Sequence, residues 1–181
     1  MMMELSPSTL SMTEDTDDTA AQELERVFEA YGDAIFRYLY IQCRDRDLGK
    51  DLTQETFLKY WQLLKRGDII EHERALLYRI AGNLFIDHIR KKKSVSLDQL
   101  LVQGVEPGID PLHETQNRME VSRALSMLGK LPEQYRQVLI LRYVDNLEPA
   151  EIAHITKETS NVISVRIHRG LRQLKSFLDH A

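Results

Sequence analysis

Four cations recur at every third position near the C-terminus, within the stretch SNVISVRIHRGLRQLKSFL that covers residues 160–178. They are Arg166, Arg169, Arg172 and Lys175, and His168 lies among them. On a helix this spacing winds the cations around one side and leaves the other side for an apolar stripe. The members of that stripe are Ile163, Ile167, Leu171, Leu174 and Leu178. Arginine and lysine bind phosphate oxygens, so the helix is a candidate for a DNA groove, although a surface helix of a small bundle would show the same pattern.

The segment before this helix favours DNA binding. Residues 131–156 read as a helix, a turn and a short helix, and a second turn precedes the basic helix. Thr159 or Ser160 can cap that last helix, and small Ala153 would allow two helices to cross closely. This order is typical of a helix-turn-helix, in which the last helix offers its first turns to the major groove.

A second group of bases closes the segment LYRIAGNLFIDHIRKKK, residues 77–93. Apolar residues cover one side of this predicted helix, while Arg79, Asn83, Asp87 and Arg90 form a narrow polar stripe. Four consecutive bases then occupy residues 90–93. One or two cations would suffice to interact with the helix dipole, so four suggest phosphate contacts as well.

A third surface combines acids and amides with one leucine, within DLTQETFLKYW at residues 51–61. At 100° per residue, Asp51, Gln54, Glu55 and Leu58 fall opposite the apolar side of the helix. An exposed leucine among carboxylates and amides can serve as a protein-docking patch. A solvated acidic face with one stray leucine is the alternative, because single exposed leucines are common.

Composition argues against several other classes. The chain has one cysteine, which excludes a disulfide framework and fits a reducing cytosol, and its six histidines are scattered without metal-ligand spacing. We therefore predict no metal, no cofactor and no catalytic residue. No stretch reaches the roughly 18 apolar residues of a membrane span, and the N-terminus lacks the pattern of a signal peptide.

These surfaces are carried by elements that all read as helices. Period-two alternation is absent over any length, so we predict an all-α chain with helices at 21–44, 48–65, 73–92, 114–129, 132–143, 149–155 and 160–178. The net charge of −4 hides a pattern: residues 1–20 and 94–113 contain five and three acids and no base, while the blocks between and after them are each +2. We predict a disordered acidic tail at 1–20, a helical domain at 21–93, a flexible acidic linker at 94–113 and a second helical domain at 114–181.

Five segments in this order resemble the extracytoplasmic-function (ECF) sigma factors of the sigma-70 family. They are DLTQETFLKYWQ, LYRIAGNLFIDHIRKKK, LPEQYRQVLILRYVDNL, EIAHIT and NVISVRIHRGLRQLK, and the resemblance covers residues of about 20 to 178. The resemblance implies a sigma region 2 bundle and a sigma region 4 helix-turn-helix. It also implies a cytoplasmic, non-enzymatic protein that binds RNA polymerase core, directs it to promoters and is controlled by an anti-sigma factor.

The resemblance also implies roles for the three surfaces. Asp51, Gln54, Glu55 and Leu58 would dock on the clamp helices of the largest polymerase subunit. The third helix and the loop at residues 66–73 would melt the −10 element and hold an extruded base, and the linker would run toward the RNA path. The −10 residues would be Asn83, Asp87, Arg90 and Lys91. The −35 residues would be Asn161, Val165, Arg166, His168, Arg169 and Arg172.

The sequence departs from the family pattern at several places. Lys157 and Glu158 occupy a turn that usually contains glycine, Ser164 replaces a residue that is commonly lysine, and Gly82 replaces a long side chain. A stand-alone helix-turn-helix regulator that binds duplex DNA without polymerase is the main alternative. A small helical enzyme or adaptor is a third possibility, which the scattered histidines disfavour.

Overall fold

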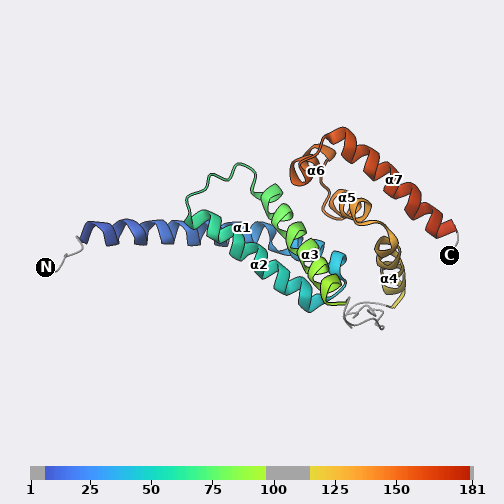
Figure 1. Cartoon of the computed structure of the whole chain (residues 1–181), viewed down its shortest axis with the longest axis horizontal. Coiled ribbons are helices and arrows are strands. Elements are labelled where there is room, and N and C mark those ends of the chain that lie inside the picture. Colours follow the sequence, from blue (N-terminus) through green and yellow to red (C-terminus); the bar gives the residue numbers. More distant parts are fainter. Residues whose placement is uncertain (1–6, 97–114, 180–181) are drawn as a thin grey trace.

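The computed structural model describes residues 7–96 and 115–179, and these residues form seven helices and no strand (Figure 1). Side chains are described within residues 18–92 and 123–177. The helices are α1 (Pro7–Cys43), α2 (Arg46–Lys65), α3 (Glu73–Ser96), α4 (Thr115–Lys130), α5 (Glu133–Tyr143), α6 (Pro149–Thr156) and α7 (Ser160–Asp179). The predicted all-α fold of two small helical domains is confirmed.

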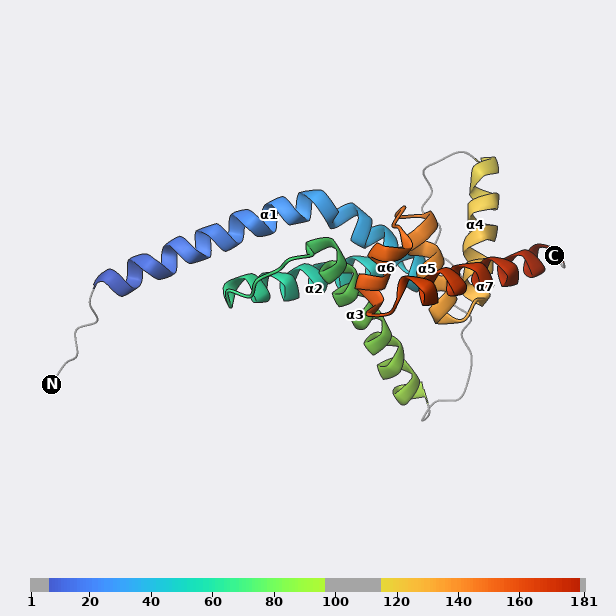
Figure 2. The same cartoon turned by 90° about the horizontal axis from the view of Figure 1, so that it is seen from above.

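The N-terminal half, α1–α3, is a bundle in which α1 and α2 run side by side and α3 crosses them (Figure 2). Its core is aliphatic and aromatic. The rings of Tyr38 and Tyr78 meet edge to face, with their centroids 5.3 Å apart. The most deeply buried members are Val27, Ile35, Tyr38, Leu39, Tyr60, Leu77 and Tyr78. Burying such side chains contributes about 1.5–3 kcal/mol each relative to exposure, so this bundle rests mainly on its apolar interior.

The start of α2 follows from local chemistry. The Asp45 carboxylate accepts hydrogen bonds from the backbone N–H groups of Asp47 and Leu48, at 3.0 and 3.1 Å. Such caps satisfy donors that the first helical turn leaves free. A Cβ atom at Gly49 would lie 3.4 Å from the Cα of Tyr40, so this glycine allows the backbones of α1 and α2 to approach closely. The cap and the close approach together fix which face of α2 points outward.

The C-terminal half, α4–α7, holds the helix-turn-helix. A capping box at Glu148 and Glu151 starts α6, and Pro149 occupies its first turn. The helix α7 lies against α5 and α6, and Ile163 is fully buried between them. The other principal core residues of this half are Val138, Ile140, Leu141, Leu147 and Ile152. The predicted order of helix, turn, short helix, turn and long helix is present.

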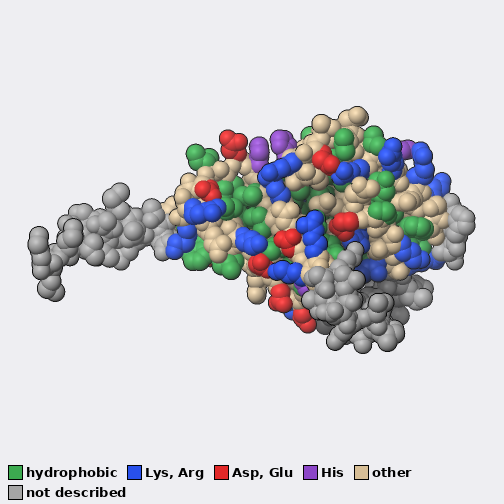
Figure 3. Space-filling model, in the orientation of Figure 1, with side chains coloured by type: hydrophobic (Ala, Val, Ile, Leu, Met, Phe, Trp, Pro, Cys, Tyr) green, Lys and Arg blue, Asp and Glu red, His purple; other side chains and the backbone are tan. Residues whose placement is uncertain are grey.

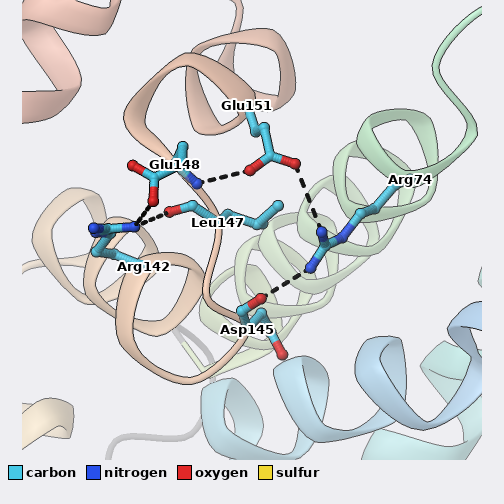
Figure 4. A network of polar contacts seen from close by, with 6 residues as sticks. All are labelled: Arg74, Arg142, Asp145, Leu147, Glu148 and Glu151. Carbon is cyan, nitrogen blue, oxygen red and sulfur yellow. Dashed lines mark hydrogen bonds and ion pairs between the residues drawn. The ribbon is translucent and has the colours of Figure 1, made fainter.

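The two halves pack against each other through α3 with α6 and α1 with α5, and their buried apolar residues form one contiguous cluster. Polar contacts accompany this packing around the turn between α5 and α6 (Figure 4). Arg37 of α1 donates to the buried Asp145 carboxylate at 2.9 Å, and Arg74 of α3 donates to the Asp145 backbone oxygen at 2.9 Å. Arg74 also lies 3.6 Å from Glu151 of α6. The chain therefore adopts a closed arrangement, in which the two halves are in contact.

Two expected boundaries differ from the structure. The helix α1 begins at Pro7, so residues 7–20 are helical, although we predicted a disordered tail. No glycine or proline interrupts residues 8–31, and extending an existing helix is far easier than nucleating one. The helix α3 also continues to Ser96. Most of the predicted linker, residues 97–113, and the first six residues lie outside the described part of the chain.

Candidate polymerase and nucleic-acid interfaces

The predicted docking patch lies on the outer face of α2. Asp51, Gln54, Glu55 and Leu58 are all exposed, and half of the Leu58 surface is accessible. Buried residues alternate with them along the helix: Leu52, Thr53, Thr56, Phe57 and Tyr60. The Glu55 carboxylate lies 3.6 Å from the ammonium of Lys59, a surface pair of little energetic weight. The geometry therefore presents the four residues together, as the helical wheel predicted.

The predicted −10 surface lies on α3. Asn83, Asp87, Arg90 and Lys91 are all exposed and follow the same side of the helix at spacings of three and four. Arg90 lies 3.9 Å from Asp87 across one turn. On the opposite side, Leu77, Ala81 and Phe85 are buried in the bundle. This polar stripe can therefore meet a nucleic acid without disturbing the core.

The predicted −35 surface lies on α7, and Figure 3 shows Lys and Arg side chains gathered along this edge of the molecule. Its exposed members are Asn161, Val165, His168, Arg169 and Arg172, while Arg166 is half-buried. Arg172 donates to Nε2 of His168 at 3.0 Å. A groove of about 350 Å³ runs along the first turns of α7 and includes Asn161, Val165, Arg166 and Arg169. The sequence missed three further members of this groove, Val162 of α7 and Gln134 and Tyr135 of α5, because nothing in their spacing points to a binding site.

Arg166 has a partner that the sequence did not reveal. Its two terminal nitrogens donate to the two carboxylate oxygens of Glu158, at 2.5 and 2.6 Å. Glu158 follows Lys157, whose backbone is left-handed with φ 58° and ψ 38°. The Glu158 N–H donates to the Ala153 oxygen at 3.2 Å. This turn ends α6 and directs the Glu158 side chain toward α7.

One residue of each predicted DNA surface, Asn83 and Arg166, lines a single groove in the closed arrangement. This groove has a volume of about 410 Å³, and Arg79 and Asn83 of α3 line it opposite Lys157, Glu158 and Arg166. The −10 and −35 elements are centred about 25 base pairs apart, or about 85 Å at 3.4 Å per base pair. The two predicted assignments therefore require the halves to move apart when both elements are bound.

Buried polar groups between the halves were also missed by sequence analysis. Burial raises the pKa of the Asp145 carboxyl, and the hydrogen bond from Arg37 opposes that shift. Burial likewise raises the pKa of Tyr38 to about 12, while hydrogen bonds from Gln42 and Gln137 lower it. Asp145 and Tyr38 make hydrogen bonds between the halves, with Arg37 and Gln137. Both are absent from the predicted surfaces, because tertiary packing decides which polar groups lie at this contact.

The described residues give no sign of other site types. Within residues 7–96 and 115–179, no helix is long and apolar enough to cross a membrane. Among the side chains described, no three histidine, cysteine, aspartate or glutamate residues converge as metal ligands.

Comparisons with known proteins identify the family of the chain. Residues 27–95 match the family model "Sigma-70 region 2", and residues 122–174 match "Sigma-70, region 4". The ECF RNA polymerase sigma factor SigW of Bacillus subtilis is 30% identical over 167 residues, which cover 84% of this chain and 87% of SigW. The chain therefore belongs to the ECF sigma factors of the sigma-70 family. It is a sigma factor, which binds RNA polymerase and directs promoter-specific initiation of transcription.

Solved structures share the fold. CnrH in complex with the cytosolic domain of CnrY has a TM-score of 0.69 and 21% identity, over 93% of this chain and 95% of CnrH. CnrH belongs to Cupriavidus metallidurans. The sigma factor RpoE in complex with the anti-sigma factor NepR, from Bartonella quintana, also has a TM-score of 0.69, with 20% identity over 88% of this chain and 96% of RpoE.

Proposed function

We propose that this sigma factor divides its work among three helices. The outer face of α2, with Asp51, Gln54, Glu55 and Leu58, docks on the clamp helices of the largest polymerase subunit. The exposed leucine carries this proposal, because half of its surface meets water in a helix whose other large apolar residues are all buried or half-buried. An apolar anchor ringed by polar groups is the usual anatomy of a binding hot spot.

The helices α3 and α7 read DNA in this proposal. Asn83, Asp87, Arg90 and Lys91 contact the melted −10 element, and the loop before α3 holds an extruded base. On α7, Asn161, Val165, His168, Arg169 and Arg172 face the −35 element in the major groove, together with Arg166. Two exposed polar surfaces on separate halves support this assignment. The chain acts by binding, without a catalytic step of its own, and works in the cytoplasm beside the chromosome.

An anti-sigma factor controls the chain in this proposal. The support is the shared fold with RpoE, whose structure holds the anti-sigma factor NepR, and with CnrH, whose structure holds part of CnrY. The test is competition between the regulator and the polymerase for the tagged chain. A protein recovered with the chain in equal amounts should be released when purified core is added. If such a protein and core bind the chain together, regulation of this kind is wrong.

The central test is selection of DNA by the reconstituted holoenzyme. Core polymerase with the chain is offered a random duplex library, and bound DNA is sequenced. We expect two conserved elements separated by a fixed spacer, absent with core alone and with the chain alone. Enrichment by the chain alone would instead support a stand-alone regulator. Failure of the chain to bind core in any condition would refute the proposal.

A further inference from the structure

Glu158 lies where an acid is unexpected, at the entrance of a helix that we propose meets DNA. The Glu158 side chain is about 30% exposed and the Arg166 side chain is about 25% exposed. Arg166 donates to it with two nitrogens, at 2.5 and 2.6 Å. Two-point Arg–carboxylate pairs are stronger and more directional than single contacts. Partial burial also protects this pair from the screening that weakens fully exposed pairs.

The turn holds Glu158 in place independently of its partner. Lys157 is left-handed, and the Glu158 backbone N–H donates to the Ala153 oxygen at 3.2 Å. Arg166 follows in the second turn of α7, so both members of the pair belong to the C-terminal half. The hydrogen bonds between the two residues therefore involve no residue of the other half.

Arg169 and Arg172, two other cations of α7, differ from Arg166 within the described part of the chain. Among the described ion pairs, none joins Arg169 or Arg172 to a carboxylate, and both residues are exposed. A cation compensated by its own carboxylate attracts phosphates weakly and releases few counterions on binding DNA. A fixed guanidinium still keeps donors for a base edge, and arginine is the commonest reader of guanine.

We propose that Glu158 is a specificity-determining residue of the −35 reader. It positions Arg166 as a fixed hydrogen-bond donor along the first turns of α7 and withholds it from the phosphate backbone. Sequence-independent attraction then rests on Arg169 and Arg172. This inference rests on the proposed function, because it assumes that α7 meets the −35 element.

The test measures the binding constant K of the holoenzyme as a function of salt concentration. Two duplexes are compared, the selected promoter and the same duplex with a scrambled −35 sequence. Each variant is compared with the wild type, so that contributions of the core cancel. For Glu158→Gln we expect the slope of log K against log salt to steepen by about 0.9, the value for one added phosphate contact. Affinity for the scrambled duplex should rise several-fold, and discrimination between the duplexes should fall.

The variant Arg166→Ala tests whether Glu158 acts by positioning Arg166 or only through its own negative charge. In the wild-type background we expect it to reduce discrimination without changing the slope. In the Glu158→Gln background it should abolish the added slope, because the released guanidinium is then gone. Arg169→Ala is the matched control, and it should flatten the slope by about 0.9 in both backgrounds.

Two results would overturn the inference. One is a slope that flattens by about 0.9 for Arg166→Ala alone, which would mean that Arg166 contacts a phosphate despite Glu158. The other is a steepened slope of log K against log salt that persists in the double variant Glu158→Gln, Arg166→Ala. That result would mean that Glu158 acts only by repelling phosphates. If Arg169→Ala has no effect either, the −35 assignment of α7 fails, and that failure concerns the proposed function itself.

Discussion

Leu58 is an apolar side chain that the fold leaves in water. It is half exposed, while its helix neighbours Phe57 and Tyr60 are buried in the bundle. Exposure of this kind has no stabilising effect on the fold, so a binding role can be separated from a structural one by mutation.

We expect the double variant Leu58→Ala, Glu55→Ala to weaken core binding at least tenfold, which corresponds to about 1.4 kcal/mol or more. Its free energy of unfolding should change by less than about 0.5 kcal/mol for each substitution, because both side chains are on the surface. Fluorescence anisotropy with labelled chain measures the affinity, and urea unfolding measures the stability. Lys50→Ala, on the same helix outside the patch, is the control. Unchanged core affinity in the double variant would remove α2 from the polymerase interface.

Lys157 carries a backbone conformation that glycine adopts more easily. Its φ of 58° is left-handed and costs about 1–2 kcal/mol for a residue with a side chain. Glycine avoids this strain but loses more entropy on folding, about 0.5–1 kcal/mol. We therefore expect Lys157→Gly to raise the free energy of unfolding by up to about 1 kcal/mol, measured by urea unfolding. A loss of stability would mean that the lysine side chain contributes a contact.

For single residues, the sequence predicted exposure correctly where the position on a helical wheel decides it. Leu58 and Asn83 were predicted to face outward because their positions relative to apolar neighbours decide the face. The pair of Glu158 with Arg166 was not predicted, since it depends on how a left-handed residue turns the chain between two helices. The burial of Asp145 was missed for a related reason, because tertiary packing of a turn decides it.

Helix crossing depends on one small residue between α5 and α7. A Cβ atom at Gly170 would lie 3.2 Å from a methyl carbon of Leu139 and 3.2 Å from the Cβ of Tyr135. These distances are shorter than ordinary contact, so the two helices approach as closely as their backbones and these side chains allow. The position of α7 therefore depends on this glycine.

We expect Gly170→Val to lower the free energy of unfolding by about 1–3 kcal/mol, because the added methyl groups force α5 and α7 apart. Gln173→Val places the same side chain on the exposed face of the same helix and should change stability by less than about 0.5 kcal/mol. Thermal or urea unfolding of both variants makes the comparison. Equal effects of the two substitutions would show that helix propensity, rather than packing, dominates.

Element types followed from the sequence, but some of their ends did not. The predicted helices correspond to α1–α7, since apolar spacing of three and four directly reflects a buried helical face. The start of α1 was misplaced because residues 7–20 have few large apolar residues, and helical periodicity cannot be read without them. The domain limits at 21–93 and 114–181 stay a prediction.

A buried carboxyl between the halves makes the closed arrangement sensitive to pH. The side chain of Asp145 is fully buried and lies 2.9 Å from Arg37. Burial raises its pKa above the ordinary 3.8, although Arg37 and Arg74 lower it. A carboxyl with a raised pKa in the docked state binds its proton more tightly there than when the halves are apart. Docking is therefore strengthened as pH falls through the raised pKa toward 3.8 and is weaker above it.

We expect small-angle scattering to show a smaller radius of gyration for the isolated chain as pH falls within that window. Asp145→Asn keeps the shape of the side chain and removes its proton equilibrium, so the variant should lose the pH dependence that this residue causes. Glu29→Gln, on the exposed surface of α1, serves as the control. An identical pH response in Asp145→Asn and the wild type would show that another group controls docking.

The groove shared by α3 and α7 has a consequence for avidity. The two halves are linked binding modules, and linked modules gain affinity only when both can engage their sites at the same time. In the closed arrangement α3 and α7 both line one groove, while the elements that we propose they read are about 85 Å apart on B-DNA. Under this proposal the free chain binds a promoter with only one half, and the avidity of two-point binding becomes available when a partner holds the halves at promoter spacing.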